Sequence, residues 1–219
     1  MGRPGAAFFV LLALLAQTTG CGIVSAIAYY LRPPQIQKPE YEFAEGTRVA
    51  ILIEAGQPRE ENPVFNEALH GRVVAMLKEG EALASVSPLR DVIELRRANP
   101  DFKKWSLQKV GRKLQVDEVL YIKIDRLEIR PTPDYPILAP AVDLHVKLIG
   151  VSHPSAHARL WPEAKEGHPV SCSRQSVEAV DTNPDAIDVE ARKLGHDTAY
   201  WVTMPFVEVD LEEKPPVER

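Results

Sequence analysis

Hydrophobic residues first form a regular pattern at positions 48–54, a nearly continuous run of β-branched and aliphatic side chains. Such a run is typical of a short strand that is covered on both faces. Asn62-Pro63 then combines an N-cap with proline at the first helical position, and Gly80 supplies a stop signal. Between these signals, one helical face holds Phe65, Leu69, Val73, Met76 and Leu77. We therefore expect a strand and then a helix.

The next segment predicts a short strand at 83–86 and two further helices. Ser87-Pro88 repeats the cap-and-proline signal and predicts a helix that runs to about 99–100. Ser106 is expected to cap the following helix, whose buried side holds Leu107, Val110 and Leu114.

Strict alternation of apolar and polar residues predicts two long strands, at 119–129 and 141–151. The proline-bearing loop between them makes an antiparallel pair the simplest arrangement. Asp143, His145 and Lys147 would then face outward. The inward side chains are Leu120, Ile122, Ile124, Val142, Leu144, Val146 and Leu148.

Weaker strand signals at 158–161 and 170–177 would extend this meander, and Asn183-Pro184 predicts the start of a final helix reaching about Trp201. The element order predicts an α/β fold, with a single mixed sheet that includes an antiparallel meander and with helices packed on it. We expect one buried cluster containing Ile51, Leu77, Leu120, Ile122, Val146 and Leu194.

The first residues are typical of an export signal. A short cationic start with Arg3 precedes an uninterrupted apolar run at 6–16, and Gly20-Cys21 follows closely. Gly20-Cys21 resembles the lipobox of bacterial lipoproteins, although Thr18 stands where an aliphatic residue is usual. The resemblance implies cleavage before Cys21 and a lipid on its side chain. The alternative is an uncleaved anchor, because the uncharged stretch 6–31 is long enough to cross a bilayer. Both alternatives place the rest of the chain outside the cytoplasm, in the bacterial cell envelope.

The resulting division of the chain has four parts. We expect a lipoprotein signal peptide at 1–20, a membrane-proximal and proline-rich tether at 21–46, the α/β domain at 47–204 and a loose C-terminal tail at 205–219.

Composition narrows the classes of partner. A formal net charge of -5 over 219 residues, with the cationic side chains scattered, argues against nucleic acid. Two cysteines exclude a disulfide framework. Glycine-rich phosphate-binding loops do not occur in the sequence, and we expect no cofactor.

Three segments carry a resemblance at the level of the domain: 48–52, 69–77 and 114–122. Together with the element order, they are similar to the α/β domain of the N-terminal part of the Tol-Pal propeller protein, the curli secretion lipoprotein and the lipoprotein activators of peptidoglycan synthases. Gln115 stands where those families usually have glycine. The resemblance implies a domain that binds other envelope proteins or assembles into oligomers, and no catalytic residue is carried over.

The alternative to a binding domain is a small hydrolase or metal-dependent enzyme that uses Asp143, His145 and His153. Ser171 or Ser173 would complete a hydrolase triad, and His153 with His157 has the spacing of a zinc pair. Pro154 favours a loop over a helix at that pair, and a half-solvated strand exposes polar residues in any case.

Aromatic residues near the C-terminus offer a candidate interface, because exposed aromatics often anchor protein contacts. They equally suit a role in covering the end of the core. Cys172 alternates with Val170 and is expected to be a small buried residue. The hypothesis is thus a lipid-anchored envelope protein, without catalysis, that binds envelope proteins or further copies of itself. The candidate interface residues are Trp161, Tyr200, Trp201 and Phe206.

Overall fold

The computed structural model describes most of the chain from residue 36 onward. The described ranges are 36–80, 85–132, 137–154, 157–178 and 184–210. The expected signal peptide, the lipidation candidate Cys21 and the alternative anchor at 6–31 lie outside them.

The chain divides into two compact units. The larger unit comprises Gln37–Val209 with Glu213–Arg219, and the smaller comprises Met1–Ile36 with Asp210–Glu212. Strands β1 (Ile36–Gln37) and β10 (Val209–Asp210) pair with each other in a two-stranded sheet. The α/β domain is the larger unit.

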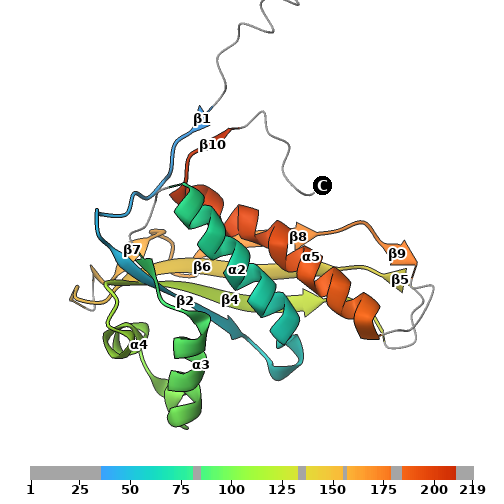
Figure 1. The fold of residues 1–219 in the computed structure, drawn as a ribbon, viewed down its shortest axis with the longest axis horizontal. Coiled ribbons are helices and arrows are strands. Elements are labelled where there is room, and N and C mark those ends of the chain that lie inside the picture. Colours follow the sequence, from blue (N-terminus) through green and yellow to red (C-terminus); the bar gives the residue numbers. More distant parts are fainter. Residues whose placement is uncertain (1–35, 81–84, 133–136, 155–156, 179–183, 211–219) are drawn as a thin grey trace, which may run out of the picture. The chain divides into compact units, whose positions relative to one another are not determined.

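A mixed sheet forms the centre of this domain, with strands in the order β3-β2-β4-β6-β7 and β8 paired to another part of β6 (Figure 1). Strand β2 is parallel to β3 and β4, whereas β4, β7 and β8 are each antiparallel to β6. The predicted antiparallel pair is confirmed as β4 and β6, and the predicted fold class is confirmed with it. The strands are β2 (Arg48–Ala55), β3 (Ser85–Val86), β4 (Glu118–Glu128), β6 (Ala141–Gly150), β7 (Arg159–Trp161) and β8 (His168–Ser173). A separate small pair is formed by β5 (Ile137–Leu138) and β9 (Val177–Glu178).

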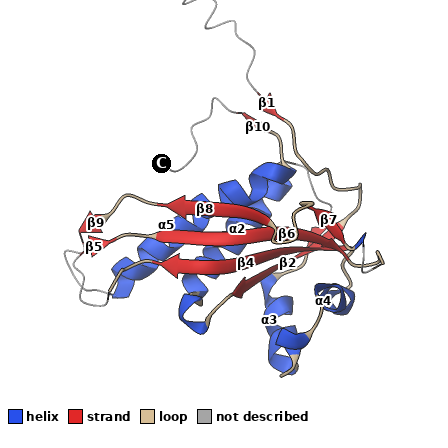
Figure 2. Cartoon of the chain, turned by 180° about the vertical axis from the view of Figure 1, so that it is seen from behind, coloured by secondary structure: helices blue, strands red, loops and turns tan. Residues whose placement is uncertain are grey.

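Four described helices cover the two faces of the sheet unequally. The long helices α2 (Pro63–Glu79) and α5 (Pro184–Thr203) pack side by side on one face, behind the strands in Figure 2. The shorter α3 (Leu89–Ala98) and α4 (Leu107–Leu114) cover the β2 side of the other face. The outer face of β6 and β8 is covered by none of these described helices. Short 3-10 turns occur at Pro58–Glu60, Phe102–Lys104 and Met204–Phe206.

Two of the predicted helix starts have the expected caps. The Asn62 side chain accepts a hydrogen bond from the Phe65 amide at 3.0 Å, and Ser106 accepts one from the Lys109 amide at 3.2 Å. The predicted cap at Ser87 is wrong: the helix has Pro88 as its N-cap residue, and the Ser87 amide donates to the Val49 carbonyl at 2.9 Å. Ser87 therefore continues the pairing of β3 with β2 before the chain turns into α3.

The predicted core is confirmed. Ile51, Leu77, Leu120, Ile122, Val146 and Leu194 all belong to one buried cluster between the sheet and helices α2 and α5. A second cluster lies under α3 and α4, and includes Ala50, Leu52, Val92 and Val119. Both faces of β2 are therefore buried, as its continuous apolar sequence predicts.

Part of the expected tether is packed against the domain. The amides of Glu40 and Tyr41 donate to the Pro205 carbonyl at 2.8 and 3.1 Å, and the Tyr41 hydroxyl donates to Glu118 at 2.9 Å. The rings of Tyr41 and Phe43 pack on the main core. The packed region thus begins before residue 47, because two aromatic side chains within a polar segment find apolar partners.

The C-terminal end also packs further than expected. Pro205 and Phe206 are buried, and so is Val209. Residues 211–219 of the expected tail lie outside the described ranges.

Candidate functional site

Strand β8 lies along the edge of the sheet, since within the described residues it pairs with β6 alone. Its alternating sequence turns Val170 and Cys172 inward, and leaves Pro169, Ser171 and Ser173 exposed. Proline is tolerated here because an edge strand needs hydrogen-bond donors on one side only. The free side of β8 is therefore a place where an extended segment of another chain can pair.

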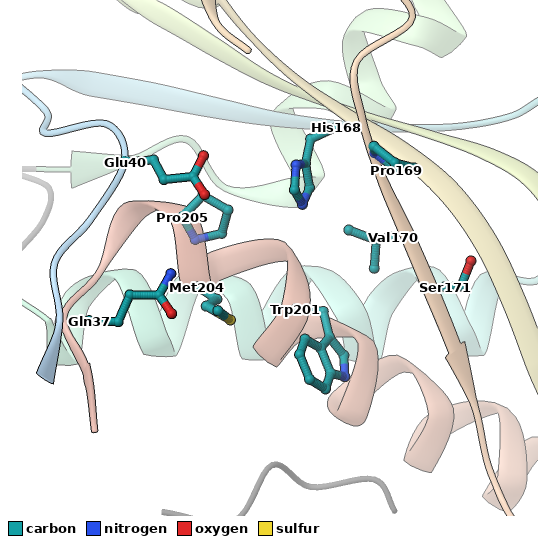
Figure 3. A pocket seen from close by; sticks show the side chains of 9 residues that line it. All are labelled: Gln37, Glu40, His168, Pro169, Val170, Ser171, Trp201, Met204 and Pro205. Carbon is teal, nitrogen blue, oxygen red and sulfur yellow. The ribbon is translucent and has the colours of Figure 1, made fainter. Parts of the chain in front are cut away.

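The last turns of α5 lie next to this strand and supply Trp201. Strand β8, α5 and the packed N-terminal segment enclose a hollow of about 230 Å³. Figure 3 shows Glu40 and His168 reaching it from opposite sides, with Trp201 and Met204 below them. The lining is mixed, because four polar side chains, Gln37, Glu40, His168 and Ser171, stand beside apolar ones.

A second hollow, of about 560 Å³, continues along β8 toward Arg126, Asp143 and Ser173. The two hollows share the lining residues Pro169, Ser171 and Trp201. Together they form one depression along the sheet edge, which we call the β8 groove. Trp201 lies at the point where the two parts meet.

Charge in the β8 groove is locally balanced around Asp143. Ser171 Oγ donates to Asp143 Oδ1 at 2.8 Å, and Arg126 Nε donates to Oδ2 at 2.8 Å. The hydrogen bond from Ser171, and then the Arg126 guanidinium, hold the pKa of the Asp143 carboxyl below its usual range. Asp143 therefore stays ionised and already has two partners.

His145 is paired with a different carboxylate. Its Nδ1 lies 2.5 Å from Asp125 Oδ2, and Lys123 bonds the other oxygen of Asp125. Lys123 lies opposite His145 in the register of β4 and β6, and Asp125, two residues further along β4, lies on the same face. The register shift between Ile124 and Arg126 then places Arg126 opposite Asp143. Burial alone would raise the pKa of Asp125, but the hydrogen bonds from Lys123 and His145 outweigh it and lower that pKa.

The structure does not bring the residues of the suggested enzyme together. Ser171 is bonded to Asp143 and His145 to Asp125, so the three do not form a hydrogen-bonded relay. His153 lies in an exposed turn after β6, where its carbonyl accepts from Gln108 Nε2 at 2.7 Å. Within the described part of the chain, no three His, Cys, Asp or Glu side chains are grouped as metal ligands would be.

The four aromatic candidates divide into two pairs. Trp161 and Phe206 are 7% and 2% exposed, and their ring centroids lie 5.0 Å apart within the core. Trp161 also stacks against His168 and donates from Nε1 to Glu40 at 3.0 Å, so it supports the floor of the β8 groove. Tyr200 and Trp201 are half-buried, with ring centroids 5.1 Å apart. Of the four, only this second pair keeps part of its surface exposed.

Cys172 is buried, as predicted, and burial raises the pKa of its thiol. Glu40 and His168 were not singled out from the sequence. The signal for Glu40 was its position beside Tyr41 and Phe43, which mark the segment as packed.

No family model and no curated protein matches the chain. Solved structures give distant likenesses. A PelC dodecamer from Paraburkholderia phytofirmans is 16% identical with a TM-score of 0.42, covering 80% of this chain and 99% of that one. Lipoprotein GNA1162 from Neisseria meningitidis is 16% identical with a TM-score of 0.40, covering 65% and 91%. The LpoB C-terminal domain from Salmonella enterica is 14% identical with a TM-score of 0.31, covering 61% and 83%.

Helices long and apolar enough for a membrane span do not occur among the residues that the structure describes.

Proposed function

We propose that this protein is a bacterial envelope lipoprotein, held to its membrane by a lipid on Cys21, and that its α/β domain binds another envelope protein without catalysis. The observation that carries the binding role is the β8 groove, which combines an unpaired strand edge with the half-buried ring of Trp201.

Membrane attachment is supported by the sequence of the N-terminus. An apolar run at 6–16 leads to Gly20-Cys21 through small and polar residues, in the order that lipoprotein signals have. One lipid chain gives weak and reversible attachment, and more than one acyl chain gives stable anchoring. Residues 22–36 would then connect the anchor to the domain.

The binding role is supported by the physical properties of the groove. Edge strands pair readily with added strands, and their backbone bonds give affinity while neighbouring side chains give specificity. Tryptophan is the side chain most often found to dominate such contacts, because it buries a large rigid surface. Asp143 and Arg126 at one end neutralise each other, so the groove suits an extended segment without a strong net charge.

The absence of catalysis is supported by how the polar groups are used. A nucleophilic serine needs an effective base within hydrogen-bond reach, and the carboxylate to which Ser171 donates is a weak base because its pKa is lowered.

The anchor is tested by metabolic labelling with a radioactive fatty acid in a bacterium that expresses the full chain. We expect label on the parent protein, and on the Cys21→Ala variant no label and a larger unprocessed form. An unlabelled parent of unchanged mobility would instead support the uncleaved anchor.

The groove is tested by photo-crosslinking in cells. A benzophenone amino acid at Ser173 should give a crosslink to a defined partner, and Trp201→Ala should reduce that crosslink about tenfold or more. The same amino acid at the exposed Lys103, in the 3-10 turn between α3 and α4, serves as control. A crosslink to a second copy of the chain would identify the partner as itself. Equal crosslinking from both positions would contradict a role for the groove.

A further inference from the structure

A second candidate site lies at the opposite edge of the sheet, where β2 is only partly paired. Strand β3 covers Arg48 and Val49, and within the described residues no strand continues it along the rest of β2. The Val49 carbonyl points to this side, since it accepts from the Ser87 amide. Alternate residues of a parallel strand direct their backbone groups the same way, so Ile51 and Ile53 also face the open edge.

A side chain occupies part of this edge in place of a strand. The Arg96 guanidinium donates from Nη2 to the Ile53 carbonyl at 3.2 Å, and lies 3.8 Å from Glu54. Arg96 thus offers its remaining N–H groups beside an unpaired strand.

A cavity of about 420 Å³ opens at this point, between the end of β2 and the first turns of α2 and α3. It lies at the carboxyl end of β2, where the two parallel neighbours of that strand, β3 and β4, lie on opposite sides. The apolar part of the lining consists of Ile53, Pro63, Leu89, Val92 and Ile93.

Part of the apolar wall of this cavity is exposed to solvent. Val92 is 3% exposed, but the neighbouring Ile93 is 39% exposed. Helix α3 therefore presents an aliphatic surface toward the cavity that has no partner in the described chain.

The polar residues that line this cavity indicate the charge of the ligand that it can bind. Two arginines, Arg90 and Arg96, are balanced by two carboxylates, Glu61 and Glu67, so neither an anion nor a cation is favoured. Asn66 Oδ1 is buried without a hydrogen-bond partner. An amide pairs with a peptide group whichever of its two ends faces that group. The lining therefore suits a neutral ligand that has an N–H, a C=O and an aliphatic group.

We propose that this cavity binds an extended, uncharged peptide segment of a partner protein. One aliphatic side chain of the segment packs on Val92 and Ile93, and its backbone bonds the Asn66 amide and the Arg96 guanidinium. Because two hydrogen bonds and one side chain hold it, an isolated tripeptide should bind with a Kd of about 0.1–1 mM. This site is separate from the β8 groove, and the inference depends neither on that groove nor on the lipid.

The test is a titration of the isotopically labelled full chain in detergent micelles, followed by NMR. The probe is N-acetyl-Ala-Leu-Ala-amide. Two counter-probes carry the same branched alkyl group with a charge, 4-methylpentanoate and 3-methylbutylamine. We expect saturable shifts for the amides of Ile53, Asn66 and Ile93 with the tripeptide, and none with either counter-probe at the same concentration.

Matched variants locate the binding. Ile93→Trp fills the cavity and should abolish the shifts, whereas Glu94→Trp places the same ring on the exposed next residue and should leave them unchanged. Asn66→Leu removes one hydrogen-bonding group and should weaken binding of the tripeptide about tenfold. This variant tests the proposal if Ile93→Trp fails to fold. Absent shifts with the tripeptide, equal binding of a charged counter-probe, or binding that survives in a folded Ile93→Trp variant would each overturn the proposal.

Discussion

Ser171 Oγ and Asp143 Oδ1 lie 2.8 Å apart on neighbouring strands, with the hydroxyl donating to the carboxylate. This bond determines what both residues can do. The serine proton is directed to an acceptor that is a weak base, because the pKa of Asp143 is below its usual range. The hydroxyl therefore acts as a structural donor at the sheet edge.

Ser171→Ala should raise the pKa of Asp143 toward its ordinary value, because the hydrogen bond from Ser171 is the main cause of the lowered pKa. A carboxyl with a depressed folded-state pKa stabilises the fold above its unfolded pKa, and that stability is lost as pH falls through the folded value. At neutral pH the cost should be at most about 1 kcal/mol, since the group is partly exposed. NMR titration of the Asp143 carboxyl measures the shift. Ser173→Ala, at the next outward position, should leave that pKa unchanged.

Leu120→Ala should lower the free energy of unfolding by about 2–5 kcal/mol, through lost burial and a residual cavity. Leu120 is fully buried in the main cluster, near the start of β4. Urea unfolding of the full chain in detergent measures the change. Val189→Ala, on the exposed side of α5, should cost less than about 1 kcal/mol. A loss below about 1 kcal/mol for Leu120→Ala would contradict its place in the core.

Gln115→Gly should stabilise the protein by about 1 kcal/mol, because Gln115 ends α4 in the left-handed conformation, with φ at 56°. Glycine adopts this conformation without steric cost. Gln115→Ala keeps the Cβ and should give no gain. Thermal unfolding of the two variants provides the comparison, and equal midpoints would show that the turn stores no strain.

Local patterns predicted the elements of this fold wherever packing and propensity agree. The apolar face of α2 predicted a helix, and the alternation in β4 and β6 predicted two strands. The structure has all three elements. The prediction of Ser87 as a helix cap was wrong, because a cap signal depends only on neighbouring residues. The Ser87 amide instead donates a hydrogen bond to the carbonyl of Val49, which is far away in the sequence. The pairing of a strand competes with the start of a helix, and the sequence alone does not show which partner is available.

The candidate site was predictable only in part. Trp201 was identified as an aromatic near the end of a helix, but its position beside β8 depends on the packing of α5 across the sheet. The contact of His145 with Asp125 was missed because the sequence does not show the register of β4 against β6, and Arg126 lies opposite Asp143 only through the irregularity in β4. An inserted residue shifts every later side chain in a strand, and alternation gives no sign of it.

His70 should make the protein less stable as pH falls below about 6.5. Burial lowers its pKa to about 4, and its Nε2 atom is buried without a hydrogen-bond partner. The unfolded chain then binds a proton between pH 6.5 and 4 that the folded chain does not, so stability is full above this window and declines through it. The loss is at most about 3 kcal/mol. Urea unfolding at several pH values measures it.

The matched variants for this effect are His70→Leu and His157→Leu. His157 is exposed, so its replacement should leave the pH dependence unchanged. His70→Leu should flatten the dependence between pH 4 and 6.5, and an unchanged slope would show that another group is responsible.

Tyr41→Phe should destabilise the domain by about 1–3 kcal/mol, because it removes the only hydrogen-bond donor found for the buried Glu118 carboxyl in the described structure. Burial raises the pKa of Glu118, and the bond from Tyr41 lowers it. A raised folded-state pKa means that the fold gains stability as pH falls through that value. Losing the bond raises the pKa further, so Tyr41→Phe should cost more at pH 8 than at pH 5.

A double-mutant cycle with Glu118→Gln isolates this contact. The amide is neutral, so the loss of the Tyr41 hydroxyl should matter less in that background, and its cost should no longer depend on pH. Urea unfolding of the four proteins at both pH values gives the coupling energy, expected at about 1 kcal/mol or more at pH 8. An equal, non-zero cost of Tyr41→Phe in both backgrounds would contradict the coupling of the hydroxyl to the Glu118 carboxylate. A cost near zero in both backgrounds would mean that the ring, which the variant keeps, and not the hydroxyl, holds the N-terminal segment on the domain. That result would leave the aromatic contacts with Phe43 and Phe206 as its attachment.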